Sequence, residues 1–251
     1  MNHNLKDKVA LVTGSSRGLG AAMVTKLAED GAQVAINYVN NEEGAQGVKE
    51  AITAKGGQAE IFKADVTDEN GVAYLCEEVK RTFGEVDILV LNATCHHRHL
   101  PIEELTWPDM LEMMDFFVKS PLLLAKELIG PMKRKKWGRI IHIGSEVFER
   151  GIPEFSNYVS AKGAQLGLTR SWASELAPHN ITVNLIAPGW IPTDMHRDAS
   201  EESIREYAEA IPMKHMGEPY DIAAMVSYLA SEDAKFITGQ KISVNGGNTF
   251  T

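Results

Sequence analysis

Three side chains in the middle of the chain have the types and spacing that acid–base chemistry needs. Tyr158 and Lys162 are four residues apart, so they share one face if that segment is helical. Ser145 follows an apolar run with the character of a strand, and active sites of parallel α/β proteins gather at the carboxyl ends of strands. A phenol with an ordinary pKa of ~10 exchanges protons poorly at neutral pH. We therefore expect the Lys162 ammonium to lower the pKa of Tyr158, and the Ser145 hydroxyl to bind the reacting oxygen.

A glycine-rich turn near the start of the chain is typical of a phosphate-binding site. It runs from Thr13 to Gly20, directly after the apolar segment 9–12 and before a helical pattern. Its glycines allow a tight turn and a close approach of phosphate, while a helix N-terminus offers free N–H groups and partial positive charge. The glycines are spaced Gly-x3-Gly-x-Gly, unlike the common dinucleotide fingerprint. A turn that only links a strand to a helix is the alternative.

These residues must be positioned by a regular alternation of strand-like and helix-like segments. We predict strands at residues 9–12, 33–38, 58–63, 86–91, 139–143, 181–186 and 241–244. We predict helices at residues 21–29, 42–55, 68–83, 107–136, 156–176, 201–210 and 220–231. This alternation indicates βαβ crossovers and therefore an α/β fold, with a mostly parallel sheet covered by helices on both faces.

Composition and length favour one domain over residues 1–251. Hydrophobic residues make up 44% of the chain and charged residues 24%, which is enough apolar surface for a core and excludes a disordered or collagen-like chain. The net charge of −9 provides no long-range attraction for nucleic acid or for an anionic membrane, so neither is expected as a partner. The irregular stretch 188–219 has its own helical piece, and we interpret it as a substrate loop or lid.

The cysteines and the N-terminal segment favour a cytoplasmic protein. Cys76 and Cys95 are the two cysteines of the chain, and isolated thiols suit a reducing compartment better than a disulfide scaffold. The first apolar run, at residues 9–12, is too short for a signal peptide or a membrane span.

Taken together, these segments resemble the short-chain dehydrogenase/reductase family, and most closely its 3-oxoacyl-acyl-carrier-protein reductases. The resemblance extends from about residue 6 to residue 247. It rests on the glycine turn, on Ser145 thirteen residues before Tyr158, on Tyr-x3-Lys, and on Asn92-Ala93, Asn184, Pro188-Gly189 and Ile237-Thr238-Gly239-Gln240. It implies a Rossmann-type doubly wound fold with a seven-stranded sheet. The Tyr-x3-Lys spacing argues against the enoyl reductases of this superfamily, in which the two residues are further apart.

The resemblance also implies the catalytic and cofactor-binding residues. Tyr158 would donate a proton to a carbonyl while a nicotinamide delivers hydride, Ser145 would hold the substrate oxygen, and Lys162 would bind the nicotinamide ribose. No metal is expected. The implied cofactor contacts are Gly14, Ser16, Arg17, Gly18, Leu19, Gly20, Asn37, Tyr38, Asp65, Val66, Asn92, Ala93, Tyr158, Lys162, Pro188, Gly189, Ile191 and Thr193.

The end of the second predicted strand favours NADP(H) over NAD(H). In this fold an acidic residue at that position bonds the ribose hydroxyls and selects NAD. Here residues 37–40 contain no carboxylate, and the first one is Glu42. Arg17, in the glycine turn, is placed to meet a 2′-phosphate. NAD(H) and a merely solvated Arg17 remain the alternatives.

The chain departs from the family pattern at the position where an asparagine usually holds a proton-relay water. That position falls on Phe117. Pro121, four residues later, has no N–H group, so the carbonyl of Phe117 lacks its normal helical partner. We hypothesise that this carbonyl binds the relay water, and the alternative is an impaired relay and a slow enzyme. Thr94 is a second departure, because it replaces the glycine of the family's Asn-Ala-Gly segment.

Two further segments have open interpretations. The loop 95–99, with His96, His97 and His99, is either a rim of the active site, a solvated loop or, less favoured, a zinc site. The basic run 133–136 either complements a helix dipole or docks an acidic carrier protein. We interpret His142 as a satisfied core residue. Trp190, Ile191, Met195, Met213 and Met216 form either an apolar substrate wall or a packing face.

The function expected from these residues is transfer of hydride between NADP(H) and a carbonyl or secondary alcohol. The expected substrate is a 3-oxoacyl thioester or a related ketone. The alternatives are a polyol, sugar or secondary-metabolite alcohol dehydrogenase, and a catalytically impaired regulatory protein that only binds the cofactor. Because family members are usually tetramers or dimers built on their two long helices, we expect a homotetramer or homodimer through segments 107–136 and 156–176.

Overall fold

A single parallel sheet forms the centre of the computed structural model, which describes residues 3–193 and 199–250. The strands have the order β3-β2-β1-β4-β5-β6-β7, and every neighbouring pair is parallel. Their bounds are β1 Val9–Val12, β2 Gln33–Tyr38, β3 Gln58–Lys63, β4 Ile88–Leu91, β5 Gly138–Ile143, β6 Ile181–Pro188 and β7 Lys241–Val244. The chain builds outward from β1 to β3, returns to β4 beside β1, and then builds outward in the other direction. This order confirms the expected doubly wound fold and makes the β1–β4 gap the topological switch point, where such folds bind ligands.

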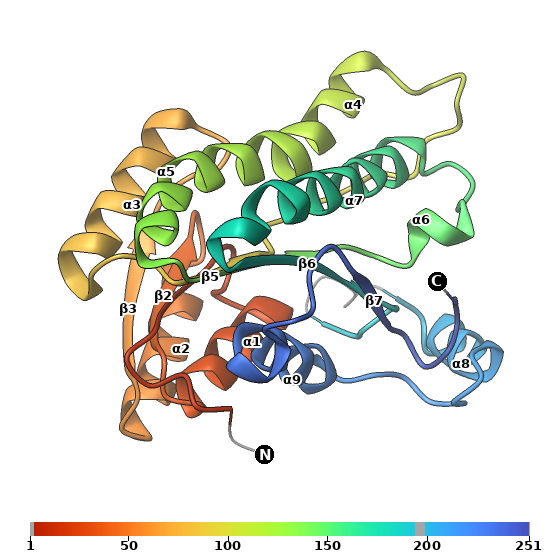
Figure 1. The fold of residues 1–251 in the computed structure, drawn as a ribbon. Coiled ribbons are helices and arrows are strands. Elements are labelled where there is room, and N and C mark those ends of the chain that lie inside the picture. Colours follow the sequence, from red (N-terminus) through yellow and green to blue (C-terminus); the bar gives the residue numbers. More distant parts are fainter. Residues whose placement is uncertain (1–2, 194–198, 251) are drawn as a thin grey trace.

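Helices cover both faces of the sheet (Figure 1). On one side lie α3 (Glu69–Phe83), α4 (Trp107–Met114), α5 (Ser120–Lys135) and α7 (Ser156–Leu176). On the other lie α1 (Gly18–Glu29), α2 (Glu42–Ala54) and α9 (Pro219–Ala230). Two short helices, α6 (Val147–Arg150) and α8 (Glu201–Ala210), lie beyond the carboxyl ends of the strands. Among the described residues, no helix is long and apolar enough to cross a membrane.

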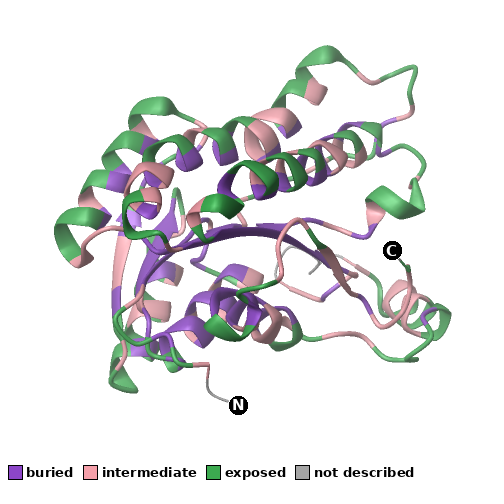
Figure 2. Ribbon diagram, in the orientation of Figure 1, coloured by how far each residue is buried: buried purple, intermediate pink, exposed green. Residues whose placement is uncertain are grey.

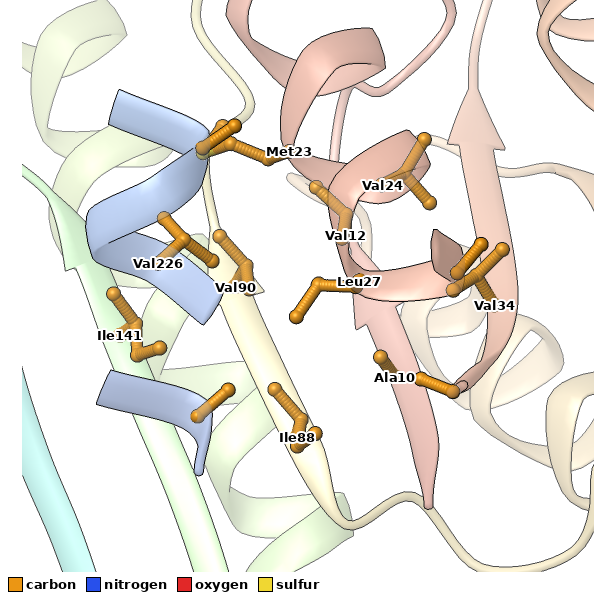
Figure 3. Packing of buried hydrophobic residues seen from close by; sticks show 14 of the residues in the cluster. Ala10, Val12, Met23, Val24, Leu27, Val34, Ile88, Val90, Ile141 and Val226 are labelled. Atoms are coloured by element: carbon orange, nitrogen blue, oxygen red, sulfur yellow. The ribbon is translucent and has the colours of Figure 1, made fainter. Parts of the chain in front are cut away.

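The central strands are buried on both faces, because helices pack on each side. All residues of β1, β4, β5 and β6 are buried (Figure 2). Alternate side chains of these strands enter two separate apolar layers. In the layer shown in Figure 3, Val12, Val90 and Ile141 meet Leu27 of α1 and Val226 of α9. Short runs that are apolar throughout are the pattern expected of parallel strands covered on both sides.

The expected helical segment 107–136 is confirmed, since residues 107–135 are helical throughout, but it is not one regular α-helix. The structure divides it into α4, the π-helical turn η1 (Asp115–Lys119) and α5. The Ser120 N–H donates to the carbonyl of Asp115, five residues back, and Pro121 immediately follows. Because proline has no N–H group, the regular α pattern cannot continue through this position. The pattern also missed α6, whose four residues are too few to show a helical period.

A buried ion pair at the end of α1 is connected to α9 by a hydrogen bond from Ser227. Lys26 Nζ lies 2.6 Å from both carboxylate oxygens of Asp30, and the Ser227 hydroxyl of α9 donates to the same carboxylate. The Asp30 side chain is fully buried and that of Lys26 is 9% exposed. A buried charge that loses its partner is strongly destabilising, so each member of this pair requires the other.

We expect Asp30→Ala to lower the free energy of unfolding by about 3–5 kcal/mol, because it leaves the Lys26 ammonium buried without an acceptor. Urea unfolding followed by circular dichroism measures this loss. Lys55→Ala is the matched control, since it removes a lysine–carboxylate pair of the same helix layer whose two side chains are exposed, and it should cost at most about 1 kcal/mol. Equal losses in the two variants would contradict the assignment.

Candidate active site

The residues singled out from the sequence converge at the carboxyl edge of the sheet. The glycine turn follows β1, Asn92 follows β4, Ser145 follows β5, and Pro188-Gly189 closes β6. The N-terminus of α1 and the first turn of α7 lie at the same edge. These segments are far apart in the sequence, and the parallel sheet brings them together because parallel strands all end on one side.

The glycine turn has a backbone that needs glycine. Gly14 and Gly18 have φ angles of +61° and +56°, and residues that have a side chain rarely adopt such angles. A Cβ atom at Gly20 would collide with the Gly14 carbonyl and with the Asn92 amide. Arg17 is the N-cap of α1 and makes no side-chain capping hydrogen bond. The first N–H groups of α1 are therefore not capped by this side chain, as a phosphate site requires.

The side-chain amides of the buried Asn37 and the half-buried Asn92 hold the turn. Asn37 Oδ1 accepts from the Gly14 N–H at 3.1 Å, and its Nδ2 donates to the Ala64 carbonyl at 3.0 Å. Asn92 Nδ2 donates to the carbonyls of Thr13 and Gly14 at 2.9 and 3.0 Å. Their amide groups are thus engaged with the backbone. Asn37 and Asn92 can shape a cofactor site, but their side chains are already occupied.

Ser145, Tyr158 and Lys162 form one cluster. The Ser145 hydroxyl acts on Tyr158, because it lowers the pKa of the phenol against the larger effect of burial. Lys162 lies one turn further along α7, with Nζ 5.3 Å from the centre of the Tyr158 ring. The ammonium donates to the carbonyl of Ile143, the last residue of β5, at 2.8 Å. A carbonyl oxygen bound near both hydroxyls would have a proton donor and a second hydrogen-bond donor at hand.

The expected lowering of the Tyr158 pKa is wrong for this environment. Burial raises the pKa of Tyr158, and the neighbouring Ser145 hydroxyl opposes this rise only in part. Burial also lowers the pKa of Lys162 to about 7. The ionised phenolate and the ammonium both lose hydration, so desolvation moves the two pKa values in opposite directions. Near neutral pH, Lys162 can therefore act as both donor and acceptor of a proton.

Phe117 places an aromatic ring where the family pattern has a polar side chain. Its ring centre lies 3.8 Å from Lys162 Nζ, and the Phe117 and Tyr158 rings pack edge to face with their centres 5.4 Å apart. The side chain is 1% exposed. The π-helical turn η1 presents this ring to the ammonium. The hypothesis that the Phe117 carbonyl holds a relay water stays a prediction.

The histidine-rich loop packs onto the same cluster. His97 stacks on the Tyr158 ring with centres 4.3 Å apart, and His99 stacks on Phe155 at 4.0 Å. The Leu100 N–H donates to the Glu154 carbonyl at 2.6 Å and fixes the end of the loop. Burial lowers the pKa of His97 to about 4, so this imidazole is neutral at physiological pH. Within residues 3–193 and 199–250, no three His, Cys, Asp or Glu residues are grouped to hold a metal ion.

Glu146, next to Ser145, is a buried carboxylate that sequence reasoning missed. The residue is 3% exposed. It accepts hydrogen bonds of 2.8–3.1 Å from side chains of three segments, namely Arg150, Tyr207, Asn245 and Asn248. Tyr207, on α8, also accepts from the Trp190 N–H at 2.8 Å. The only sequence signal was an acidic residue directly after a strand-end serine.

A cavity of about 260 Å³ lies beside α8. Its apolar lining includes Trp190, Ile191, Ile211 and Met213, which agrees in part with the expected apolar wall. Met195 lies outside the described residues, as do the other residues of 194–198. Glu146 and Tyr207 therefore connect the Ser145 loop, the helix of the expected lid and this cavity.

Two other interpretations are changed by the structure. His142 is completely buried, and neither ring nitrogen has a hydrogen-bond partner among the described residues, so its interpretation as a satisfied core histidine is wrong. In the basic run 133–136, three side chains are paired within the protein. Lys133 lies 3.8 Å from Glu175, and the other two pairs are Arg134–Glu85 at 3.9 Å and Lys135–Asp87 at 2.8 Å.

We expect Tyr207→Phe to loosen α8, because it removes the hydroxyl that links this helix to Glu146 and to the Trp190 N–H. Hydrogen–deuterium exchange of residues 201–210 should become roughly ten times faster, since a hydrogen bond to a charged group contributes about 1.5–3 kcal/mol. Tyr220→Phe, at a tyrosine of α9 that is 59% exposed, is the control. Unchanged exchange of α8 in Tyr207→Phe would show that the network does not hold the helix.

Comparisons with known proteins agree with this architecture. A family model described as Enoyl-(Acyl carrier protein) reductase matches residues 14–249. The 3-oxoacyl-[acyl-carrier-protein] reductase FabG of Staphylococcus epidermidis is 41% identical over 243 residues, which cover 96% of this chain and 98% of the relative. FabG of Escherichia coli K12 is 38% identical over 246 residues, with coverage of 97% and 98%.

Solved structures give the same result. A double-substitution variant of the Serratia marcescens short-chain dehydrogenase/reductase superposes with a TM-score of 0.91 at 36% identity, covering 99% of this chain and 100% of that chain. A blue fluorescent protein from a metagenomic library, in complex with NADPH, has a TM-score of 0.90 at 38% identity, with coverage of 98% and 100%. On this sequence similarity and this fold, the chain belongs to the short-chain dehydrogenase/reductase family.

Proposed function

We propose that this protein is an NADP(H)-dependent oxidoreductase that transfers hydride between the nicotinamide and a carbonyl or secondary alcohol. The observation that carries the proposal is the clustering of Ser145, Tyr158 and the Lys162 ammonium at the edge of the sheet that also holds the glycine turn. The substrate class we propose is a 3-oxoacyl thioester or a related ketone. The names of the FabG relatives support this substrate class.

The glycine turn fits a dinucleotide, because Gly14 and Gly18 adopt positive φ angles and the N-terminus of α1 has no side-chain cap. When bound, the nicotinamide supplies the hydride. The Tyr158 hydroxyl donates the proton to the substrate oxygen, and the Ser145 hydroxyl donates a hydrogen bond to that same oxygen. Lys162 would donate to the ribose hydroxyls of the bound cofactor, and with a pKa of about 7 it could return a proton to Tyr158.

The preference for NADP(H) rests on the surroundings of the adenosine end. Residues 37–40 contain no carboxylate. The first carboxylate after β2 is Glu42, which adds to the effect of burial in raising the pKa of Tyr38. Arg17 is exposed at the start of α1, where its guanidinium can reach a 2′-phosphate. The similar blue fluorescent protein, solved with NADPH, supports this choice.

The remaining expected cofactor contacts have surroundings that suit the adenine side and the nicotinamide side. Asp65 accepts from the N–H and hydroxyl of Thr67, and Val66 is buried beside it. A Cβ at Gly18 would contact the Thr193 side chain, so Thr193 lies directly against the glycine turn. We propose that these residues, with Pro188-Gly189 and Ile191, complete the cofactor site.

Reduction of an enoyl double bond, the activity named by the family model, is the second candidate function. Tyr158 and Lys162 lie one turn apart on α7, which favours the ketoreductase. The other alternative is a catalytically impaired protein that only binds the cofactor, and Phe117 is the one residue that supports it.

We also propose that the chain is one domain with a lid at 188–219. For the oligomer we propose a homodimer or homotetramer through α4, α5 and α7, where Trp107, Leu111 and Leu122 are exposed.

We expect Tyr158→Phe to lower NADPH oxidation with an acetoacetyl thioester by about 10²–10⁴-fold, because it removes the proton donor. Nicotinamide absorbance measures the rate. NADPH binding, followed by fluorescence, should stay within about twofold of the parent protein, which separates lost chemistry from lost folding. Full turnover in Tyr158→Phe would refute the proposed mechanism.

We expect Arg17→Ala to weaken NADPH binding roughly ten- to a hundredfold and to leave NADH binding nearly unchanged, since only NADPH has the phosphate that Arg17 would pair with. Fluorescence titration with each cofactor measures both affinities. Arg81→Ala, at an exposed arginine of α3, controls for the loss of one positive charge. Equal losses for NADPH and NADH would contradict the 2′-phosphate assignment.

A further inference from the structure

Lys162 is a buried ammonium with few acceptors. The residue is 5% exposed, and an ammonium has three N–H donors. One hydrogen bond goes to the Ile143 carbonyl at 2.8 Å and one to Gln165 Oε1 at 3.1 Å. The Phe117 ring lies over Nζ at 3.8 Å. Of the side chains that the structure describes, Gln165 is the one that accepts a hydrogen bond from this ammonium.

Among the residues that the structure describes, no anionic side chain lies against Lys162 to compensate its charge. The titratable groups that face it are Cys95 after β4, His97 of the histidine loop, His142 of β5 and Tyr158 of α7. Burial raises the pKa of the Cys95 thiol to about 11 and lowers those of His97 and His142 to about 4 and 3. All of these groups are therefore neutral at pH 7, since burial also raises the pKa of Tyr158. The charge of Lys162 is stabilised by two carbonyl oxygens and by the face of an aromatic ring.

Gln165 is held where it can accept a hydrogen bond from the Lys162 ammonium. It follows Lys162 by three residues on α7, so the two side chains lie on the same face of the helix. The residue is 1% exposed, which leaves its amide little freedom to turn toward solvent. A buried amide oxygen that meets a buried ammonium is a charge-assisted contact, and it is worth about twice a neutral one.

We propose that Gln165 is a positioning residue that keeps the Lys162 ammonium protonated and aimed at the cofactor and Tyr158. The proposal rests on the function proposed above for Lys162. Phe117 supports the proposal, because its ring lies on the other side of the ammonium and has no oxygen that could accept a hydrogen bond. Gln165 is therefore needed as the side-chain acceptor. In this chain the amide acceptor of the lysine is supplied by its own helix, α7, rather than by the segment α4–η1–α5.

Loss of the Gln165 side chain is expected to lower the pKa of Lys162. Gln165 Oε1 stabilises the ammonium more than the neutral amine, because it accepts an N–H that the buried lysine must otherwise leave unpaired. Removing it lowers the pKa of Lys162 below about 7. The lysine then loses its proton at a lower pH, and every property that needs the ammonium is lost at that lower pH as well.

The test compares Gln165→Met, which keeps the volume and removes the acceptor, with Gln165→Glu, which keeps the shape and adds an anion. Thr169→Val is the control, because Thr169 is a fully buried residue of the same helix whose hydroxyl donates to a backbone carbonyl. The first readout is the pH titration of lysine Cε signals by ¹³C NMR, with the Lys162 signal assigned from its absence in Lys162→Met. The second is the pH profile of kcat/KM for NADPH-dependent ketone reduction.

We expect the Lys162 midpoint to fall by about one pH unit in Gln165→Met, which corresponds to a hydrogen bond of about 1.4 kcal/mol to a charged group. It should rise in Gln165→Glu and stay unchanged in Thr169→Val. The alkaline limb of kcat/KM should move in the same direction in each variant.

Identical midpoints in all four proteins would overturn the role of Gln165, as would equal shifts in Gln165→Met and Thr169→Val. A parent protein that reduces no ketone would refute the proposed function, whereas the NMR titration would still decide the role of Gln165. The two failures are thus distinguishable.

Discussion

Burial of the Lys162 ammonium is the constraint on which the site depends. A cation in a low-dielectric interior is costly unless acceptors reach it, and the fold delivers them from two directions. The carboxyl end of β5 brings the Ile143 carbonyl, and the next turn of α7 brings Gln165. Phe117, on the π-helical turn, closes the remaining side with its ring. The resulting pKa of about 7 makes this lysine responsive to small changes in its contacts.

Polar side chains that are hydrogen-bonded within the protein also organise the rest of the carboxyl edge. Asn37 and Asn92 satisfy backbone groups of the glycine turn, so this turn is held before any ligand arrives. Glu146 collects donors from the Ser145 loop, from α8 and from the segment after β7. Because a buried carboxylate needs such donors, the network ties the helix beside the cavity to the loop that carries the serine. Preorganisation of this kind is what positions reacting groups without cost at the moment of reaction.

Aromatic rings enclose the Tyr158 side chain. His97 stacks on the ring, Phe155 lies 4.8 Å away, and the edge of Phe117 completes the enclosure. These neighbours exclude water from the phenol and raise its pKa. The proposed proton donor is therefore kept protonated, and the neighbouring Ser145 hydroxyl is the group that opposes this effect.

The sequence by itself determined the fold and the place of the candidate site. Apolar runs such as 9–12 and 139–143 and the helical period of 156–176 are local patterns, and the motif spacing of Tyr158 and Lys162 is local as well. Only the tertiary structure decided the pKa directions of Tyr158 and Lys162, the interruption at Asp115–Lys119 and the roles of Glu146 and Gln165. Desolvation and hydrogen bonding depend on neighbours from other elements, such as Tyr207, which is 61 residues from Glu146. A local sequence pattern cannot predict such a neighbour, because the parallel sheet is what brings these distant segments to one edge.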